Sequence, residues 1–246
     1  MKMTRRCWLH STLLFLLSSH FAFADGGRST VLPSGGSWQI EQTATEVSSE
    51  AARVAQMTAV RITATRTVGM MQERSTGSGV IVASGGYVIT AHHVVRGADT
   101  VELTMADRQR LGLRLVCVDT RHDLALLKVD SRRSFTAASL ADCQCIRKGK
   151  SVLVAGAPEH DATLCLCPAC IGERRTVVWD GRKAPLRSVR LTVHAGYSGG
   201  GCYDAATGKL LGIVVAKSIR YLGNGYFVPA DRIAEMLNRG KTASQA

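Results

Sequence analysis

The chain has 246 residues, a hydrophobic share of 46% and a formal net charge of +12 at pH 7. This length suits one two-lobed β protein or two small domains. The basic residues are scattered and have few aromatic neighbours, which favours a solvated basic surface and argues against nucleic-acid binding. Beyond the N-terminal segment, no stretch is long and apolar enough to span a bilayer, so we expect no membrane span in the mature chain.

The first 24 residues have the pattern of a secretory signal peptide. Basic residues open the segment, residues 13–17 (Leu-Leu-Phe-Leu-Leu) form a short apolar core, and residues 22–24 (Ala-Phe-Ala) form a cleavage site before Asp25. We therefore expect removal of residues 1–24 and export of the mature protein to the periplasm or the outside of the cell.

The segment 25–58 is expected to hold a linker and one helix. Residues 25–38 are rich in Gly and Ser and read as a flexible lead-in. Apolar residues then recur at helical spacing, which predicts an amphipathic helix over 43–57, and residues 48–50 (Ser-Ser-Glu) suit a helix start. The helix would either cover a barrel or support assembly.

From Ala59 onward the hydrophobic period becomes two, and short β-rich runs alternate with turns. After the first run, strands are predicted near 78–83, 87–90, 100–104, 113–118, 124–129, 151–155, 175–179, 187–193, 209–216 and 225–228. A helix over 231–239 closes the chain. This order predicts an all-β fold of two packed antiparallel β-barrels, about 59–140 and 147–230, within a domain over 59–246 that is flanked by the two helices.

Three motifs supply His, Asp and Ser in the chain order of a chymotrypsin-type triad. His93 follows a predicted strand, Asp123 begins an apolar strand, and Ser198 lies in the glycine turn 196–200 (Gly-Tyr-Ser-Gly-Gly). A serine hydroxyl needs a base within reach, and the base needs an orienting carboxylate. Each residue alone is weak evidence, since a lone His is usually polar surface and such an Asp often only enters a strand. Together they predict a nucleophilic site between the two strand groups.

These motifs resemble the trypsin-like serine proteases, most closely the HtrA/Deg type. The segments that carry the resemblance cover about 59–238 in family order and are 77–82, 86–95, 123–129, 154–158, 196–200 and 225–230. The resemblance implies a chymotrypsin-like fold and a serine endopeptidase that cleaves unfolded or flexible protein segments through an acyl-enzyme, with no cofactor. It assigns the base to His93 rather than His92. It also implies a homotrimer, and the chain's end at Ala246 leads us to expect no PDZ domain.

The oxyanion hole is expected from the backbone N–H groups of Gly196 and Ser198. The residue before the nucleophile is usually Asn or Asp in such proteases, but here it is Tyr197, and Gly201 follows the glycine pair. Because Tyr197 has no carboxylate, activation by a freed N-terminal amine is not expected. The oxyanion loop must be held in another way, and a switchable or non-catalytic binding protein on a protease scaffold is the alternative reading.

The substrate pocket is expected to accept small or aliphatic side chains. The segment 189–197 contains no carboxylate, so a buried Arg or Lys of the substrate would be an unpaired charge. The predicted lining residues are Thr192, Val193, Val215, Ala216 and Lys217. Lys217 leaves a preference for acidic side chains open.

Seven of the eight cysteines lie beyond the predicted signal peptide. Five fall in two clusters, and the disulfide candidates are Cys143, Cys145, Cys165, Cys167, Cys170 and Cys202. Export favours structural disulfides, among them a Cys165–Cys170 staple, and an odd count leaves at least one thiol free or shared between chains. A zinc site or a redox pair at residues 167–170 (Cys-Pro-Ala-Cys) is the alternative. We predict no bound metal.

Overall fold

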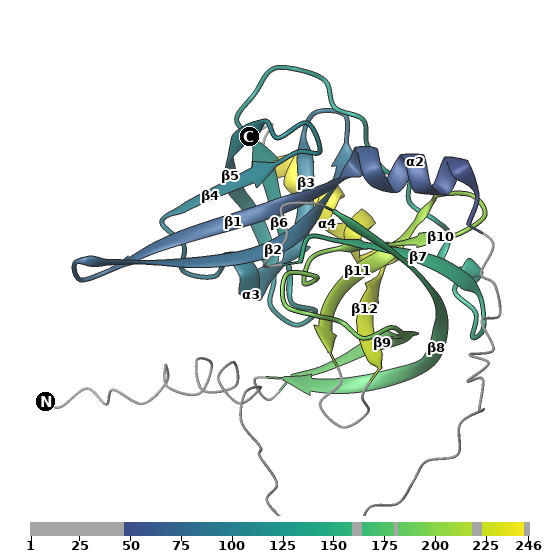
Figure 1. The fold of residues 1–246 in the computed structure, drawn as a ribbon. Helices are drawn as coiled ribbons and strands as arrows, with labels where there is room; N and C mark the ends of the chain where they lie inside the picture. Colours follow the sequence, from purple (N-terminus) through teal and green to yellow (C-terminus); the bar gives the residue numbers. More distant parts are fainter. Residues whose placement is uncertain (1–46, 159–163, 180–181, 218–222, 244–246) are drawn as a thin grey trace, which may run out of the picture. The chain divides into compact units, whose positions relative to one another are not determined.

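A computed structural model describes residues 47–158, 164–179, 182–217 and 223–243, all within one compact unit, Gln42–Ala246 (Figure 1). The predicted signal peptide, the lead-in over 25–38 and the first residues of the expected helix lie outside the described residues. The described elements are mostly strands, in the order that the period-two pattern predicted.

The first barrel closes from six antiparallel strands in the order β1-β2-β3-β6-β5-β4. Its strands are β1 (Ala59–Val68), β2 (Met71–Ala83), β3 (Tyr87–Ala91), β4 (Thr100–Thr104), β5 (Arg110–Asp119) and β6 (Leu124–Val129). Burial alternates along β1, where Val60, Ile62 and Ala64 are buried and the residues between them are half-exposed. The short helix α3 (His92–Val95) follows β3 directly.

The second barrel closes in the order β10-β11-β12-β9-β8-β7. Its strands are β7 (Ser151–Gly156), β8 (Cys165–Trp179), β9 (Arg182–Arg190), β10 (Gly201–Asp204), β11 (Leu210–Lys217) and β12 (Asn224–Pro229), and the 3-10 turn η1 (Cys143–Cys145) lies between the barrels in sequence. The predicted architecture of two barrels with a helix at each end is therefore confirmed.

Strand β2 begins earlier than predicted because it forms one arm of a long hairpin with β1. Val68 pairs with Met71 across a two-residue turn, and Gly69 has a φ of 63° at the first turn position. Glycine adopts this conformation without steric cost, and such turns match the twist of antiparallel strands. Residues 71–75 are exposed, so the hairpin arm has no buried face that a hydrophobic pattern could reveal.

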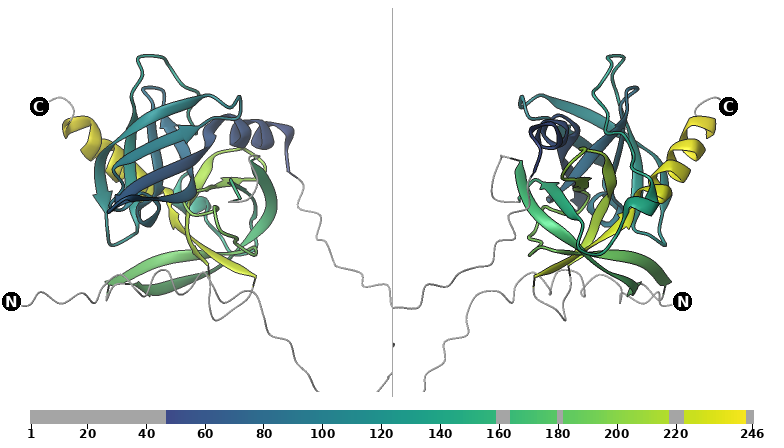
Figure 2. Two further views of the ribbon diagram at one scale, coloured as in Figure 1. Left: turned by 60° about the vertical axis from the view of Figure 1, so that its left-hand side comes forward. Right: turned by 90° about the vertical axis from the view of Figure 1, so that its right-hand side faces the viewer.

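The N-terminal helix α2 (Ser49–Thr58) starts where the Ser-Ser-Glu segment predicted and not at residue 43. The Ser48 side chain caps it by accepting a hydrogen bond from the Ala51 N–H at 3.0 Å. The helix packs against the second barrel at β7 and β10 (Figure 2). The Thr58 and Tyr203 hydroxyls lie 2.9 Å apart.

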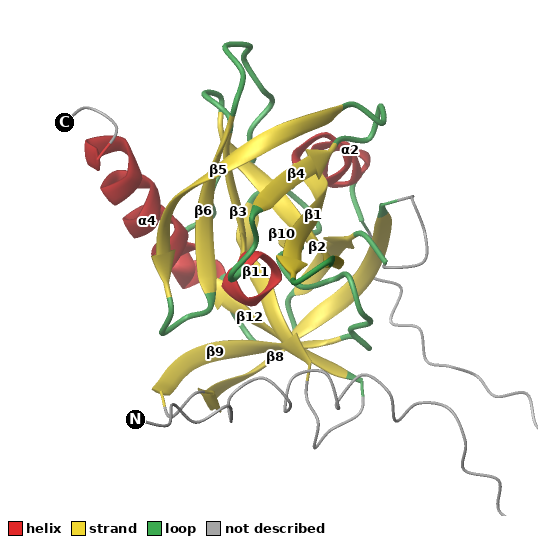
Figure 3. Ribbon diagram, turned by 90° about the vertical axis from the view of Figure 1, so that its left-hand side faces the viewer, coloured by secondary structure: helices red, strands yellow, loops and turns green. Residues whose placement is uncertain are grey.

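The closing helix α4 (Ala230–Ala243) is longer than the predicted 231–239. It packs along β5 and β6 of the first barrel and against β11 and β12 of the second, as Figure 3 shows for the first barrel. Its apolar residues Ile233, Met236 and Leu237 are buried, as the helical spacing indicated. Within the described ranges, no helix has the length and apolar character needed to cross a bilayer.

The long strand β8 excludes two of the expected pairings among the cysteines. The seven described cysteines are free thiols. Cys165, Cys167 and Cys170 all lie along this one strand, which rises about 3.3 Å per residue. Cys165 and Cys170 are therefore about 16 Å apart, whereas a disulfide needs Cα atoms within about 7 Å. The same extension separates Cys167 from Cys170, so the expected staple and the alternative redox pair do not form.

The second barrel contains a largely buried ion pair. The Lys150 Nζ lies 2.8 Å from Asp204 Oδ2, and the Asp204 side chain is only 9% exposed. Burial alone would raise the pKa of Asp204, but the hydrogen bond and charge of Lys150, together with backbone N–H groups, lower it overall. The ionised carboxylate is therefore part of the folded structure.

Replacing Asp204 by Asn should lower the free energy of unfolding by about 1–3 kcal/mol near neutral pH, because Lys150 loses its partner. Asp204 has a lowered pKa in the folded state, so its contribution is present above its unfolded pKa of about 4 and is lost as the pH falls through the folded value. Urea unfolding at several pH values measures both effects. The control is Glu50→Gln in the exposed Glu50–Arg53 pair, and an equal loss there would contradict the prediction.

Candidate active site

Asp123 holds the histidine loop through three acceptor atoms. Its Oδ2 lies 2.5 Å from Nδ1 of His93, its Oδ1 accepts the His93 backbone N–H at 2.9 Å, and its carbonyl oxygen accepts the His92 N–H at 2.8 Å. Asp123 has a φ of 56°, a left-handed conformation that Asp tolerates better than most residues. This turn directs both the carbonyl and the carboxylate of Asp123 toward the start of α3.

The two adjacent histidines differ in environment. The His93 side chain is 43% exposed while its carboxylate partner is 15% exposed, so the imidazole faces solvent and the carboxylate lies behind it. Burial lowers the pKa of His92, and the charges of Arg96 and His93 lower it further against the opposing effect of Asp123. The structure therefore places His93, and not His92, with its ring against Asp123.

A second Asp–His pair supports the turn that carries Asp123. His122 is buried, and its Nδ1 lies 2.7 Å from Asp119 Oδ2. Asp119 Oδ1 also accepts the backbone N–H groups of Arg121 and His122. Burial opposes ionisation of Asp119, but these hydrogen bonds lower its pKa overall. The carboxylate of Asp119, the last residue of β5, thus fixes the turn between β5 and β6 that carries Asp123.

Ser198 comes from the second barrel, and glycine contacts place it beside the histidine loop. A methyl group built on Gly77 would lie 2.7 Å from the Val94 side chain and 3.0 Å from the Ser198 carbonyl oxygen. One built on Gly199 would overlap Thr90 and lie 3.0 Å from the Ala91 backbone nitrogen. Only residues without a side chain allow this approach, so both glycines bring the serine loop against the residues that flank His93.

Ser78 of β2 joins the two barrels at this point. Its backbone N–H donates to the Ser198 carbonyl at 2.8 Å, and its hydroxyl donates to the Gly196 carbonyl at 2.6 Å. The same hydroxyl accepts the Ala157 N–H at 2.8 Å, while Thr90 donates to the Ser78 carbonyl at 2.6 Å. Ser78 is fully buried. Sequence reasoning noted the Gly-Ser-Gly segment only as part of a resemblance and assigned Ser78 no role.

The backbone of the serine loop is ordered by its own hydrogen bonds. The Tyr197 N–H donates to His194 O, the Gly199 N–H to Val214 O, and the Gly200 N–H to Tyr197 O. Gly196 has a φ of 94°, which requires glycine. Within the described chain, the N–H groups of Gly196 and Ser198 donate to no backbone carbonyl. These are the two donors that the sequence assigned to the oxyanion hole.

The expected pocket residues differ in their surroundings. Val193 is buried in the interior of the second barrel, whereas Val215 belongs to the larger apolar cluster that includes the first barrel. Thr192 is exposed, and the side chains of Ala216 and Lys217 lie outside the described structure. The lining of the substrate pocket and the substrate preference therefore stay predictions.

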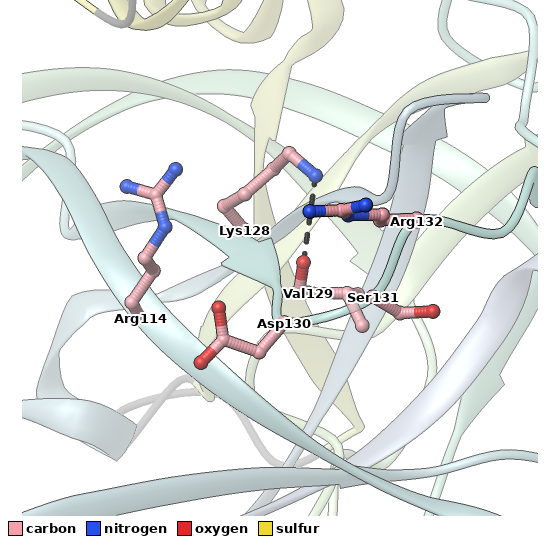
Figure 4. A pocket seen from close by; sticks show the side chains of 6 residues that line it. All are labelled: Arg114, Lys128, Val129, Asp130, Ser131 and Arg132. Carbon is pink, nitrogen blue, oxygen red and sulfur yellow. Dashed lines mark hydrogen bonds between the residues drawn. The ribbon is translucent and has the colours of Figure 1, made fainter.

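The described surface also has a hollow of about 370 Å³ (Figure 4). It is lined by Arg114, Lys128, Val129, Asp130, Ser131 and Arg132. Strand β6 runs from Leu124, next to Asp123, to Val129, so the hollow and Asp123 lie at opposite ends of the same strand. In the ranges that the structure covers, no group of three or more His, Cys, Asp and Glu residues could hold a metal ion.

Comparison with known proteins assigns the family. Residues 77–213, more than half of the chain, match the family model of the trypsin-like peptidase domain. The chain belongs to this family. A probable periplasmic DegP-like serine endoprotease of Pseudomonas putida is 32% identical over 69% of this chain and 36% of its own length. One of Rhizobium meliloti is 32% identical over 66% of this chain and 32% of its own length.

A solved structure of the HtrA-type protease AlgW with a tripeptide is 27% identical, with a TM-score of 0.69 over 77% of this chain and 62% of that one. These similarities confirm the resemblance to the HtrA/Deg type that the motifs indicated. The chain spans about a third of the length of the DegP-like relatives, so their complete activities apply here only as proposals.

Ser78→Ala should weaken both the docking of the barrels and the serine loop. The substitution leaves the buried Ala157 N–H and Gly196 carbonyl without their partner, which costs about 1–3 kcal/mol of unfolding free energy. Urea unfolding measures this loss, and Ser198 reactivity in the folded variant should fall as well. Ser75→Ala, on the exposed arm of the same strand, is the matched control. Equal stability of the two variants would contradict the assigned role of Ser78.

Proposed function

We propose that this protein is an exported serine endopeptidase that hydrolyses peptide bonds in unfolded or flexible protein segments. The observation that carries the proposal is the Asp123–His93 hydrogen bond beside the serine loop that Ser78 holds in place. The family match supports the same chemistry. The substrate class follows from similarity to the HtrA/Deg type.

In this mechanism, His93 Nδ1–H donates to Asp123, which leaves Nε2 free to accept the Ser198 proton. The Ser198 oxygen attacks the substrate carbonyl and forms a tetrahedral intermediate, whose oxyanion accepts hydrogen bonds from the N–H groups of Gly196 and Ser198. His93 then gives its proton to the leaving amine, and an acyl-enzyme remains. Water, activated by His93, hydrolyses the acyl-enzyme and restores the serine.

Replacing Ser198 or His93 by Ala should lower kcat by a factor on the order of 10⁴ or more while the protein stays folded. Hydrolysis of unfolded casein measures the rate, and a fluorophosphonate probe measures covalent modification of the serine. The double variant should be little worse than either single variant, because the residues act as a unit. Probe labelling that persists in Ser198→Ala would falsify the assignment, and an unreactive wild-type protein would favour the non-catalytic alternative.

Export is proposed from the N-terminal pattern and from the periplasmic names of the similar proteins. Cleavage after residues 22–24 (Ala-Phe-Ala) should give a mature chain that begins at Asp25. Mass spectrometry of the protein recovered from the periplasmic fraction measures the new N-terminus. Ala24→Leu, which removes the small residue at the cleavage site, should leave the leader attached. A wild-type protein that still begins at Met1 after export would contradict the proposal.

A further inference from the structure

Tyr197, directly before the proposed nucleophile, points away from solvent and into the second barrel. Its side chain is only 4% exposed, although its backbone lies in the loop that presents Ser198. The interior cluster around it includes Val154, Val193 and Phe227. Val193 is also buried there. The segment 194–196, with the exposed His194, therefore runs between two buried side chains, those of Val193 and Tyr197.

The ring of Tyr197 rests on the backbone of β7. A methyl group built on Gly156 would lie 2.6 Å from the Tyr197 Cδ1 atom and 2.9 Å from Cγ, so any larger residue at this position would displace the ring. Gly156 pairs with Cys165 of β8, and Val154 pairs with Cys167. Paired residues share a face of the sheet, so both thiols line the same interior space as the ring.

The Tyr197 hydroxyl reaches the Cys167 thiol, with 3.2 Å between Oη and Sγ. Burial and the nearby thiols of Cys167 and Cys165 raise the pKa of this hydroxyl, so it stays neutral over the working pH range. The loop therefore has an uncharged anchor at the position where trypsin-like proteases usually carry Asn or Asp.

We propose that Tyr197 is a positioning residue that sets the geometry of the serine loop through its ring on Gly156 and its hydrogen bond to Cys167. The backbone gives the route of this effect. The Tyr197 N–H and carbonyl bond to His194 and Gly200, and its two peptide bonds connect directly to Gly196 and Ser198. A shift of the ring therefore moves the two N–H groups assigned to the oxyanion hole. The inference rests on the proposed function, because it requires Ser198 to be the nucleophile.

The test compares the rate constant for fluorophosphonate labelling in folded variants with kcat and KM on unfolded casein. Tyr197→Ala should lower the labelling rate constant and kcat by about 10²-fold or more with little change in KM, since misplacing one oxyanion donor has this effect. Tyr197→Phe keeps the ring and should react at least about tenfold faster than Tyr197→Ala. Cys167→Ser keeps a hydrogen-bonding partner for the hydroxyl and should remain close to wild type.

Two conservative variants, Tyr197→Phe and Cys167→Val, each remove only the hydrogen bond between the two side chains. Their labelling rates test this bond even if Tyr197→Ala does not fold. Each should slow labelling by about 3- to 10-fold, the worth of one neutral hydrogen bond. If the two groups act through each other, the double variant should be no slower than the slower single variant. Additive losses would overturn the role of the hydrogen bond.

Two matched controls separate positioning from general packing. Tyr203→Phe removes another buried tyrosine hydroxyl, which is hydrogen-bonded to Thr58, and Cys117→Val replaces another half-buried strand thiol. Both should lower the melting temperature without slowing the labelling of Ser198. If the controls slow the labelling of Ser198 as much as the Tyr197 variants do, Tyr197 contributes only to packing, and the inference is overturned.

The outcomes also separate the inference from the proposed function. Wild-type labelling that is lost in Ser198→Ala, together with equally fast labelling of folded Tyr197→Ala, would leave the protease function standing and overturn the positioning role. Absence of labelling in the wild type would overturn both.

Discussion

The whole site depends on one buried contact between the two barrels. Ser78 connects strand β2 to the serine loop and to the end of β7 with hydrogen bonds of 2.6 to 2.8 Å. Such bonds tolerate displacements of only a few tenths of an ångström, so the distance between the barrels is fixed at this point. The proposed triad needs this constraint, because neither barrel alone holds both His93 and Ser198.

The first barrel contributes Asp123 and His93, the proposed acid and base, at the edge of the inter-barrel contact. Strand β6 is buried over Leu124–Leu127, and it begins directly after Asp123. A carboxylate at the end of such a strand moves little, and Asp119 with His122 fixes the turn that precedes it. The imidazole of His93 then needs only one more contact, its hydrogen bond to Asp123, to be oriented.

Three cysteines of the second barrel, Cys165, Cys167 and Cys202, pack in its interior. Cys202 is fully buried, and burial raises the pKa of its thiol far above the usual range. Cys165 and Cys167 pack against the same interior cluster. A small apolar side chain with a weak hydrogen-bonding atom suits a space that also receives the hydroxyl of Tyr197. The exported setting predicted from the sequence permits disulfides but does not require them, since the geometry of an extended strand decides whether two thiols meet.

Much of the fold and the identities of the proposed triad could be predicted from the sequence alone. The alternation along β1, the capped start of α2 and the His, Asp and Ser motifs are local patterns. Each such pattern determines the secondary structure or the chemistry of its own segment. Only the tertiary structure decided which distant groups meet: Ser78 with Gly196, and Tyr197 with Cys167. These contacts depend on strand register and on the docking of the two barrels, and no local pattern specifies a partner 30 positions away, as for Tyr197 and Cys167, or 118 positions away, as for Ser78 and Gly196.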